Sequence, residues 1–326
     1  MVAGKPFSHL RLLIQAQNCA SRVLGVALAA LVVGCGRSGV GLRTATLSAP
    51  TVVASDSPSH HLRVLSINDS TSGIVFRIYH DSISGHAARS AIPTLLSMYR
   101  EVGRMAGADP AQVHWHAVVF LRQGNPWQAA GETRWPVEVD GSGAVTAVGA
   151  DFLYRVVPHE QVHAVQNSFS PGLPRWFAEG QATWIGLRIT SNWRTALAEG
   201  ERLQLSAAQA ASTTGVDLRN WGGLRPKREA IMRQVDPVTR SRMQADSGYF
   251  PTGSFAFGPD DIESDESNAR ARYSASAEIM SYVCDRAGED GLVAWFRAVW
   301  AHRSRDTDQL IQLAREHAGV DLAERL

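Results

Sequence analysis

The sequence predicts an α+β fold, with a small mixed sheet and one long helix followed by a mostly helical C-terminal part. Two observations support this. Up to about residue 190, the hydrophobic pattern changes in the order strand, strand, helix, strand, strand, helix, helix. After residue 270, three amphipathic helical patterns follow one another. The chain has 326 residues, enough for one large domain or two modest ones.

The composition is that of an ordinary globular protein. Hydrophobic residues make up 44% of the chain, charged residues make up 19%, and the formal net charge is +1. Because there is no excess of positive charge, nucleic acid is not an expected partner.

The N-terminus has the pattern of a secretion signal. Lys5, Arg11 and Arg22 precede the apolar run "VLGVALAALVVGC", which ends at Cys35 and is too short to cross a bilayer. The ending "LVVGC" resembles the lipobox of bacterial lipoproteins, in which the cysteine carries the lipid. We therefore expect a lipoprotein-type signal peptide over residues 1–34 and lipidation at Cys35. The alternative is an ordinary signal peptide cleaved nearby.

This resemblance implies a lipid-anchored protein of the bacterial cell envelope. The residues after Cys35 lack an aspartate that would retain a lipoprotein at the inner membrane, which favours the outer membrane, facing the periplasm. Cys284 is then the single cysteine of the mature chain with a free thiol, because Cys35 carries the lipid, so no intrachain disulfide is expected.

We expect the elements before residue 190 to form one domain, over residues 62–190. Residues 35–61 are rich in Ser, Gly, Thr and Ala and predict a flexible tether. "LRVLSI" and "GIVFRIYH" predict a hairpin, "GHAARSAIPTLLSMYREVGRMAG" a helix and "VHWHAVVFLRQ" a strand. "PVEVDGSGAVTAV" predicts a second hairpin, and "DFLYRVVPHEQVHAVQNS" and "PRWFAEGQATWIGLRI" predict two helices.

Residues 191–326 predict a helical subdomain that is interrupted by an irregular insertion at 213–270. Its helices are expected at "SNWRTALAEGERLQLSAAQAA", "ARARYSASAEIMSYVCDRAG", "EDGLVAWFRAVWAH" and "DTDQLIQLAREHAG". The insertion could act as a lid or as a surface for a partner.

The stretch "PHEQVH" predicts two metal ligands on one helix. His159 and His163 are four positions apart, so both imidazoles lie on the same face, as two ligands of a tetrahedral zinc require. Glu160 follows the first histidine, where it can accept a proton from zinc-bound water that attacks a carbonyl. The motif alone is moderate evidence, so a third ligand is needed.

Glu179 is the candidate third ligand. Turn-forming residues separate it from His163, and Pro174 suits the first turn of a second helix. Two antiparallel helices would bring the Glu179 carboxylate back to the two imidazoles. Gly180 would let another element pack closely against this second helix.

These motifs resemble those of the gluzincin metallopeptidases, and in particular the bacterial zincin-like domains called peptidase MA-like. The resemblance rests on His159-Glu160-x-x-His163 followed by Trp176-Phe177-x-Glu179-Gly180-x-Ala182. It covers roughly residues 66–190 and, more loosely, 270–326. It implies a zincin-like fold, zinc as the cofactor, a peptide or protein as the substrate, and a helical tyrosine, here Tyr273, that stabilises the oxyanion.

The sequence departs from the gluzincin pattern at two positions. Pro158 precedes the first histidine, so the metal helix is expected to begin near Val156 or to bend there. Thr183 stands where several gluzincins have an acidic residue that orients the first histidine.

Several of these residues also have a purely structural interpretation. The His159 and His163 pair could be a surface pair, Glu160 a helix former, Glu179 an exposed charge and Tyr273 a packing residue. The other candidate sites are interpreted as structural. His114 and His116 are expected to be packed or to lie on the sheet surface, and Cys284 is expected to be an inert thiol.

The sequence thus predicts zinc-dependent hydrolysis of peptide bonds, with zinc in a cleft between the two parts and the "AVTAV" strand at its edge. The alternative is a lipoprotein that keeps the fold but acts as a binding or scaffold protein. An intact Glu160 favours the enzyme, because a binding module has no use for a base beside two histidines.

Overall fold

The fold is described from a computed structural model. It describes residues 49–56, 62–122, 134–212, 216–219, 221–222, 225–246, 249, 251, 262–263 and 268–326. The expected signal peptide, the lipidation site Cys35 and most of the expected tether lie outside these residues. No helix in the described part is long and apolar enough to cross a membrane.

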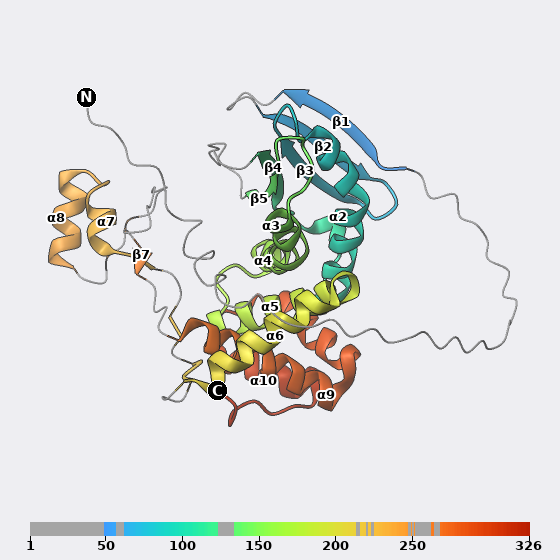
Figure 1. Ribbon diagram of the computed structural model, residues 1–326. Coiled ribbons are helices and arrows are strands. Elements are labelled where there is room, and N and C mark those ends of the chain that lie inside the picture. The colour runs from blue at the N-terminus through green and yellow to red at the C-terminus, as the bar shows by residue number, and fades with distance from the viewer. Residues whose placement is uncertain are drawn as a thin grey trace, which may run out of the picture. The chain divides into compact units, whose positions relative to one another are not determined.

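A five-stranded mixed sheet forms one end of the larger compact unit, which comprises residues 47–223 and 264–326 (Figure 1). Its strands are β1 (Thr51–Asp56), β2 (Arg63–Asp69), β3 (Ile74–His80), β4 (Ala117–Arg122) and β5 (Arg134–Val139), and they lie in this order. β1, β2 and β3 pair antiparallel, whereas β3–β4 and β4–β5 pair parallel. The expected hairpin of β2 and β3 and the mixed sheet are therefore confirmed.

The long helix α2 (Gly85–Met105) connects the parallel strands β3 and β4 and packs on one face of the sheet. Its apolar positions recur with helical spacing, so residues such as Leu95, Met98 and Val102 are fully buried in the core. The turn into α2 is held by Asp81, whose carboxylate accepts hydrogen bonds from Ser84 and from the backbone N–H of Arg122.

Two segments near the sheet differ from the expectation. Residues Thr51–Asp56, placed in the tether, form the edge strand β1, because the β-branched run Thr51-Val52-Val53 pairs in register with β2. The second hairpin is reduced to a single bridge between Val139 and Val145. Thr146 then caps the short helix α3 (Ala147–Asp151), so "AVTAV" supplies no cleft-edge strand.

The helical part continues the same core across residue 190. It consists of the π-helical turn η2 (Phe152–Val156) and of α4 (Val157–Phe169), α5 (Arg175–Trp193), α6 (Thr195–Ala210), α9 (Ala269–His302) and α10 (Thr307–Ala318); a 3-10 turn, η1 (Pro110–Gln112), precedes β4. Figure 1 shows α4 and α5 between the sheet and the C-terminal helices. The two helices expected before and after residue 288 are joined in α9, where Gly288 with φ 74° marks the break.

The described residues between 225 and 263, inside the expected irregular insertion, belong to a separate unit. This unit contains the short strands β6 (Arg225–Pro226) and β7 (Ile262–Glu263), which pair antiparallel, and the helices α7 (Arg228–Met232) and α8 (Pro237–Ala245). Asp236 begins α8 by accepting hydrogen bonds from the N–H groups of Val238 and Thr239.

Gly180 allows α5 to approach α9, as the sequence predicted. A Cβ at this position would lie 2.6 Å from the carbonyl oxygen of Ser276, so the two helix backbones are nearly in contact. The site described below lies on the same helix, one position before this contact.

We predict that Gly180→Ala lowers the free energy of unfolding by about 1–3 kcal/mol, because α9 must move away from α5. Gly200→Ala is the matched control: nothing lies within 4 Å of its added Cβ, so it should raise stability slightly through helix propensity. Urea denaturation of both variants measures this difference. Equal effects at the two positions would contradict the close packing.

Candidate metal centre

The helix α4, which carries the two histidines, begins directly after the π-helical turn η2, in which the N–H of Val157 donates to the carbonyl of Phe152. Pro158 lacks an N–H and would break a regular helix here. The widened turn accommodates it, and the hydroxyl of Thr190 on α5 lies 2.8 Å from the carbonyl oxygen of Tyr154, which compensates for the lost backbone bond. The expected irregularity at Pro158 is therefore confirmed as a π turn.

Three side-chain atoms converge between α4 and α5. The Nε2 atoms of His159 and His163 lie 3.2 Å apart, and the Glu179 Oε2 atom lies 3.4 Å from each of them. Among the described residues, these three form the one group of His, Cys, Asp or Glu side chains with spacing suited to a metal ion.

The distances between the three atoms fit zinc better than they fit hydrogen bonds. Donor atoms about 2.0–2.1 Å from a tetrahedral zinc ion lie about 3.3–3.4 Å from one another. Charge-assisted N–H···O hydrogen bonds are shorter, about 2.7–2.9 Å. Glu179 Oε2 is buried and forms no hydrogen bond in the part of the chain that the structure describes, so its lone pairs face only the two imidazoles. Two nitrogens and one oxygen are also a donor set that suits zinc.

His163 is fixed by a glutamine that connects α4 to α5. Its Nδ1 lies 2.7 Å from Gln166 Oε1, and the Gln166 Nε2 donates to the carbonyl of Ala178 and to Gln181 Oε1, both at 2.9 Å. The glutamine oxygen must therefore face His163, so Nδ1 carries a proton, and Nε2, which faces Glu179, is the nitrogen that can bind a metal ion once its own proton is lost. The sequence analysis missed Gln166, although its i+3 spacing from His163 places both on one helix face.

Glu179 is oriented by Arg175, one turn earlier on α5. The Arg175 Nε lies 3.9 Å from the second carboxylate oxygen, Oε1, while Oε2 faces the histidines. Arg175 is largely buried, so this charge contact is less screened than a surface ion pair. Arg175 was also missed, and its i,i+4 spacing from Glu179 is the signal that could have identified it.

Glu160 lies beside the group, where its charge interacts with His159, His163 and Glu179. Burial raises the pKa of its carboxyl, the nearby Glu179 adds to this, and the two imidazoles oppose it. A carboxylate with a raised pKa is a better proton acceptor than one at its ordinary value.

Tyr273, on α9, borders the group from the C-terminal part of the chain. Its ring centroid lies 6.2 Å from that of His159, and the planes of the two rings make an angle of 59°. The close Gly180–Ser276 contact holds α9 at this distance from α5. Side chains from before and after residue 190 therefore border the candidate centre.

The remaining candidates lie elsewhere or have other contacts. His114 and His116 precede β4 and do not lie within a strand; His116 Nδ1 accepts a hydrogen bond from Trp135, and His114 is exposed. The Thr183 hydroxyl is buried and has no hydrogen-bond partner among the described residues, so it does not take the place of the acidic residue that orients the first histidine in several gluzincins. Cys284 is a free thiol whose pKa is raised by burial, in keeping with an inert cysteine.

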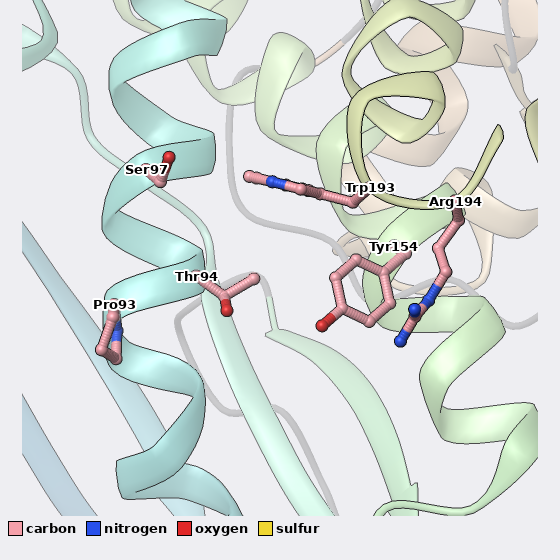
Figure 2. A pocket seen from close by; sticks show the side chains of 6 residues that line it. All are labelled: Pro93, Thr94, Ser97, Tyr154, Trp193 and Arg194. Carbon is pink, nitrogen blue, oxygen red and sulfur yellow. The ribbon is translucent and has the colours of Figure 1, made fainter. Parts of the chain in front are cut away.

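A hollow of about 370 Å³ lies between α2, η2 and the end of α5. Figure 2 shows Thr94, Tyr154 and Trp193 facing one another across it. The residues that line it are Pro93, Thr94, Ser97, Tyr154, Trp193 and Arg194. They include none of the three converging side chains, so this hollow is separate from the candidate metal centre.

No protein-family model matches the chain. No curated protein matches it either. Among solved structures it is similar to a two-domain M1 zinc metallopeptidase bound to L-arginine, with 14% identity, a TM-score of 0.46 and coverage of 81% of this chain and 50% of that one.

Two further solved structures are similar to the chain. An aminopeptidase N family protein from Idiomarina loihiensis has 11% identity and a TM-score of 0.43, over 84% of this chain and 45% of that one. An M1 zinc metallopeptidase from Deinococcus radiodurans has 12% identity and a TM-score of 0.38, over 77% and 47%. The chain spans about half the length of these structures.

We predict that Gln166→Leu lowers zinc affinity about 10- to 100-fold, because His163 loses the partner that fixes its ring and tautomer. Competition with a fluorescent chelator measures this affinity. Gln312→Leu, which removes a glutamine–glutamate contact on the exposed side of α10, is the control and should leave it unchanged. Equal affinities for wild type and Gln166→Leu would show that Gln166 does not support the ligand.

The pH dependence of metal binding follows from the pKa of His163 in the metal-free protein. Burial lowers this pKa, but the contact with Glu179 and the nearby negative charges outweigh burial and raise it to about 9. Since this folded pKa lies above the ordinary value of 6.5, the His163–Glu179 contact stabilises the metal-free protein fully below pH 6.5 and is lost as the pH rises through about 9.

Zinc must therefore displace a proton from His163 at neutral pH. We expect the apparent zinc affinity to rise about tenfold per pH unit between pH 7 and 8 and to level off near pH 9. Calorimetry in buffers of different ionisation enthalpy should detect about one proton released at pH 7. An affinity that does not change between pH 7 and 8 would contradict the coupling.

Proposed function

We propose that this chain is a zinc-dependent peptidase. The observation that carries the proposal is the convergence of His159 Nε2, His163 Nε2 and the buried Glu179 Oε2 at mutual distances of 3.2–3.4 Å. Three protein ligands leave a fourth position open, which is typical of catalytic zinc and not of structural zinc.

Bound zinc would supply Lewis acidity toward a carbonyl and lower the pKa of water. The residues of the chain would then have separate tasks. Glu160 accepts the proton of the attacking water and returns it to the leaving amine. The Tyr273 hydroxyl donates a hydrogen bond to the carbonyl oxygen as negative charge develops on it. Gln166 and Arg175 hold His163 and Glu179 in place.

Peptides or proteins are the proposed substrates. We also propose that the mature chain is anchored by lipid at Cys35 and faces the periplasm from the outer membrane of a bacterial envelope. The support for this location is the "LVVGC" ending of the apolar run and the absence of an aspartate after Cys35. Labelling with radioactive palmitate, compared between wild type and Cys35→Ser, tests the anchor.

We predict that Glu160→Gln retains zinc but cleaves a peptide library about 10²- to 10⁴-fold more slowly than wild type, because the base is lost while the ligands remain. The measurements are the zinc content of the purified 36–326 chain by mass spectrometry and the rate of peptide cleavage. His159→Ala should lose both zinc and activity, whereas His114→Ala, which removes an exposed histidine outside the group, should lose neither.

The possible outcomes separate an enzyme from a scaffold. Stoichiometric zinc with equal cleavage by wild type and Glu160→Gln would favour a lipoprotein that retains the fold to bind or organise a partner. Wild type without zinc would remove the metal site and with it the proposed peptidase.

A further inference from the structure

Trp221 lies in a short described stretch, residues 221–222, and contacts two neighbours of the candidate metal centre. Its side chain is only 4% exposed and belongs to the main core. The sequence analysis assigned no task to this residue and left the whole 213–270 segment open. In the structure, Trp221 contacts two residues that adjoin the proposed ligands.

The first contact is with Tyr273. The two ring centroids lie 5.4 Å apart with planes at 88°, a favourable edge-to-face arrangement. Tyr273 in turn lies 6.2 Å from the ring of His159. Trp221 therefore limits how far the Tyr273 ring can turn away from the candidate centre.

The second contact is with Arg175. Its guanidinium carbon lies 4.6 Å from the Trp221 ring centroid, within the range of a cation–π interaction. The Arg175 Nη1 also donates a hydrogen bond of 3.2 Å to the carbonyl of Gly222, the residue after the tryptophan. Arg175 Nε faces Glu179 Oε1, so Arg175 connects Trp221 to a proposed ligand.

The indole acts through its ring and not through its N–H. Trp221 Nε1 is buried and forms no hydrogen bond with any residue that the structure describes. The segment is fastened independently, because Leu218 is buried in the core and Arg219 pairs with Asp308 at 2.8 Å. The backbone near Trp221 is thus anchored by neighbouring residues, while the tryptophan ring itself contacts Tyr273 and Arg175.

We propose that Trp221 is a positioning residue of the candidate metal centre: its ring holds Tyr273 against His159 and holds Arg175 toward Glu179. This inference rests on the proposed function. Trp221 lies outside the metal-binding motif, so the motif alone does not indicate that this residue supports the site.

The test compares Trp221→Leu with Trp221→Phe in the full mature chain. Leucine keeps apolar bulk but removes the aromatic face, so zinc affinity by chelator competition should fall about tenfold, and kcat should fall more than KM rises. Phenylalanine keeps the aromatic face and loses an N–H that has no partner among the described residues, so it should restore most of both values. Phe120→Leu is the control: that ring is fully buried in the core on strand β4, so its loss should cost stability without changing zinc affinity.

A double-mutant cycle identifies the route. If Trp221 acts on kcat by holding Tyr273, Trp221→Leu should lower kcat much less in a Tyr273→Phe background than in wild type. Additive effects would overturn that half of the inference, and unchanged zinc affinity in Trp221→Leu would overturn the other half. If wild type binds zinc and the Trp221 variants match it in zinc affinity and kcat, the positioning role is wrong but the proposed function stands. A wild-type chain that binds no zinc overturns the proposed function and this inference together.

Discussion

The approach of α4 to α5 is the constraint on which the candidate centre depends. His159 and His163 share a face of α4 by helical periodicity, but the third atom, Glu179 Oε2, comes from α5 and reaches 3.4 Å only if the two helices pack closely. Gly186 makes this possible, because a Cβ there would lie 3.2 Å from the Cβ of His159. Gln166 then joins the helices by hydrogen bonds at the level of the histidines.

The same arrangement explains why a polar group can be buried at this point. A carboxylate removed from water without a partner is costly, and burial alone would raise the pKa of Glu179. The two imidazoles outweigh burial and lower that pKa instead. A cation bound to the three atoms would satisfy the carboxylate more completely than the long contacts to two histidines, so the burial of Glu179 is consistent with a metal site.

Local patterns in the sequence predicted the hairpin, the long helix, the two metal-site helices and the role of Gly180, because each depends on neighbours along the chain. The structure also brings together the three side chains that the motif selected.

The sequence did not predict the reduced second hairpin, because the turn at Asp140 forms as expected but Thr146 then caps a helix. It also missed Gln166, Arg175 and Trp221. The first two had helical spacing from a ligand, whereas Trp221 comes from an irregular segment whose path is set by tertiary packing and has no periodic signal.

The most direct measurement is anomalous diffraction at the zinc absorption edge from a crystal of the mature chain grown with one equivalent of zinc. We expect a single strong peak between α4 and α5, about 2.0–2.2 Å from His159 Nε2, His163 Nε2 and Glu179 Oε2. A crystal containing stoichiometric zinc with no peak at this position, or with Glu179 turned away from both imidazoles, would contradict it.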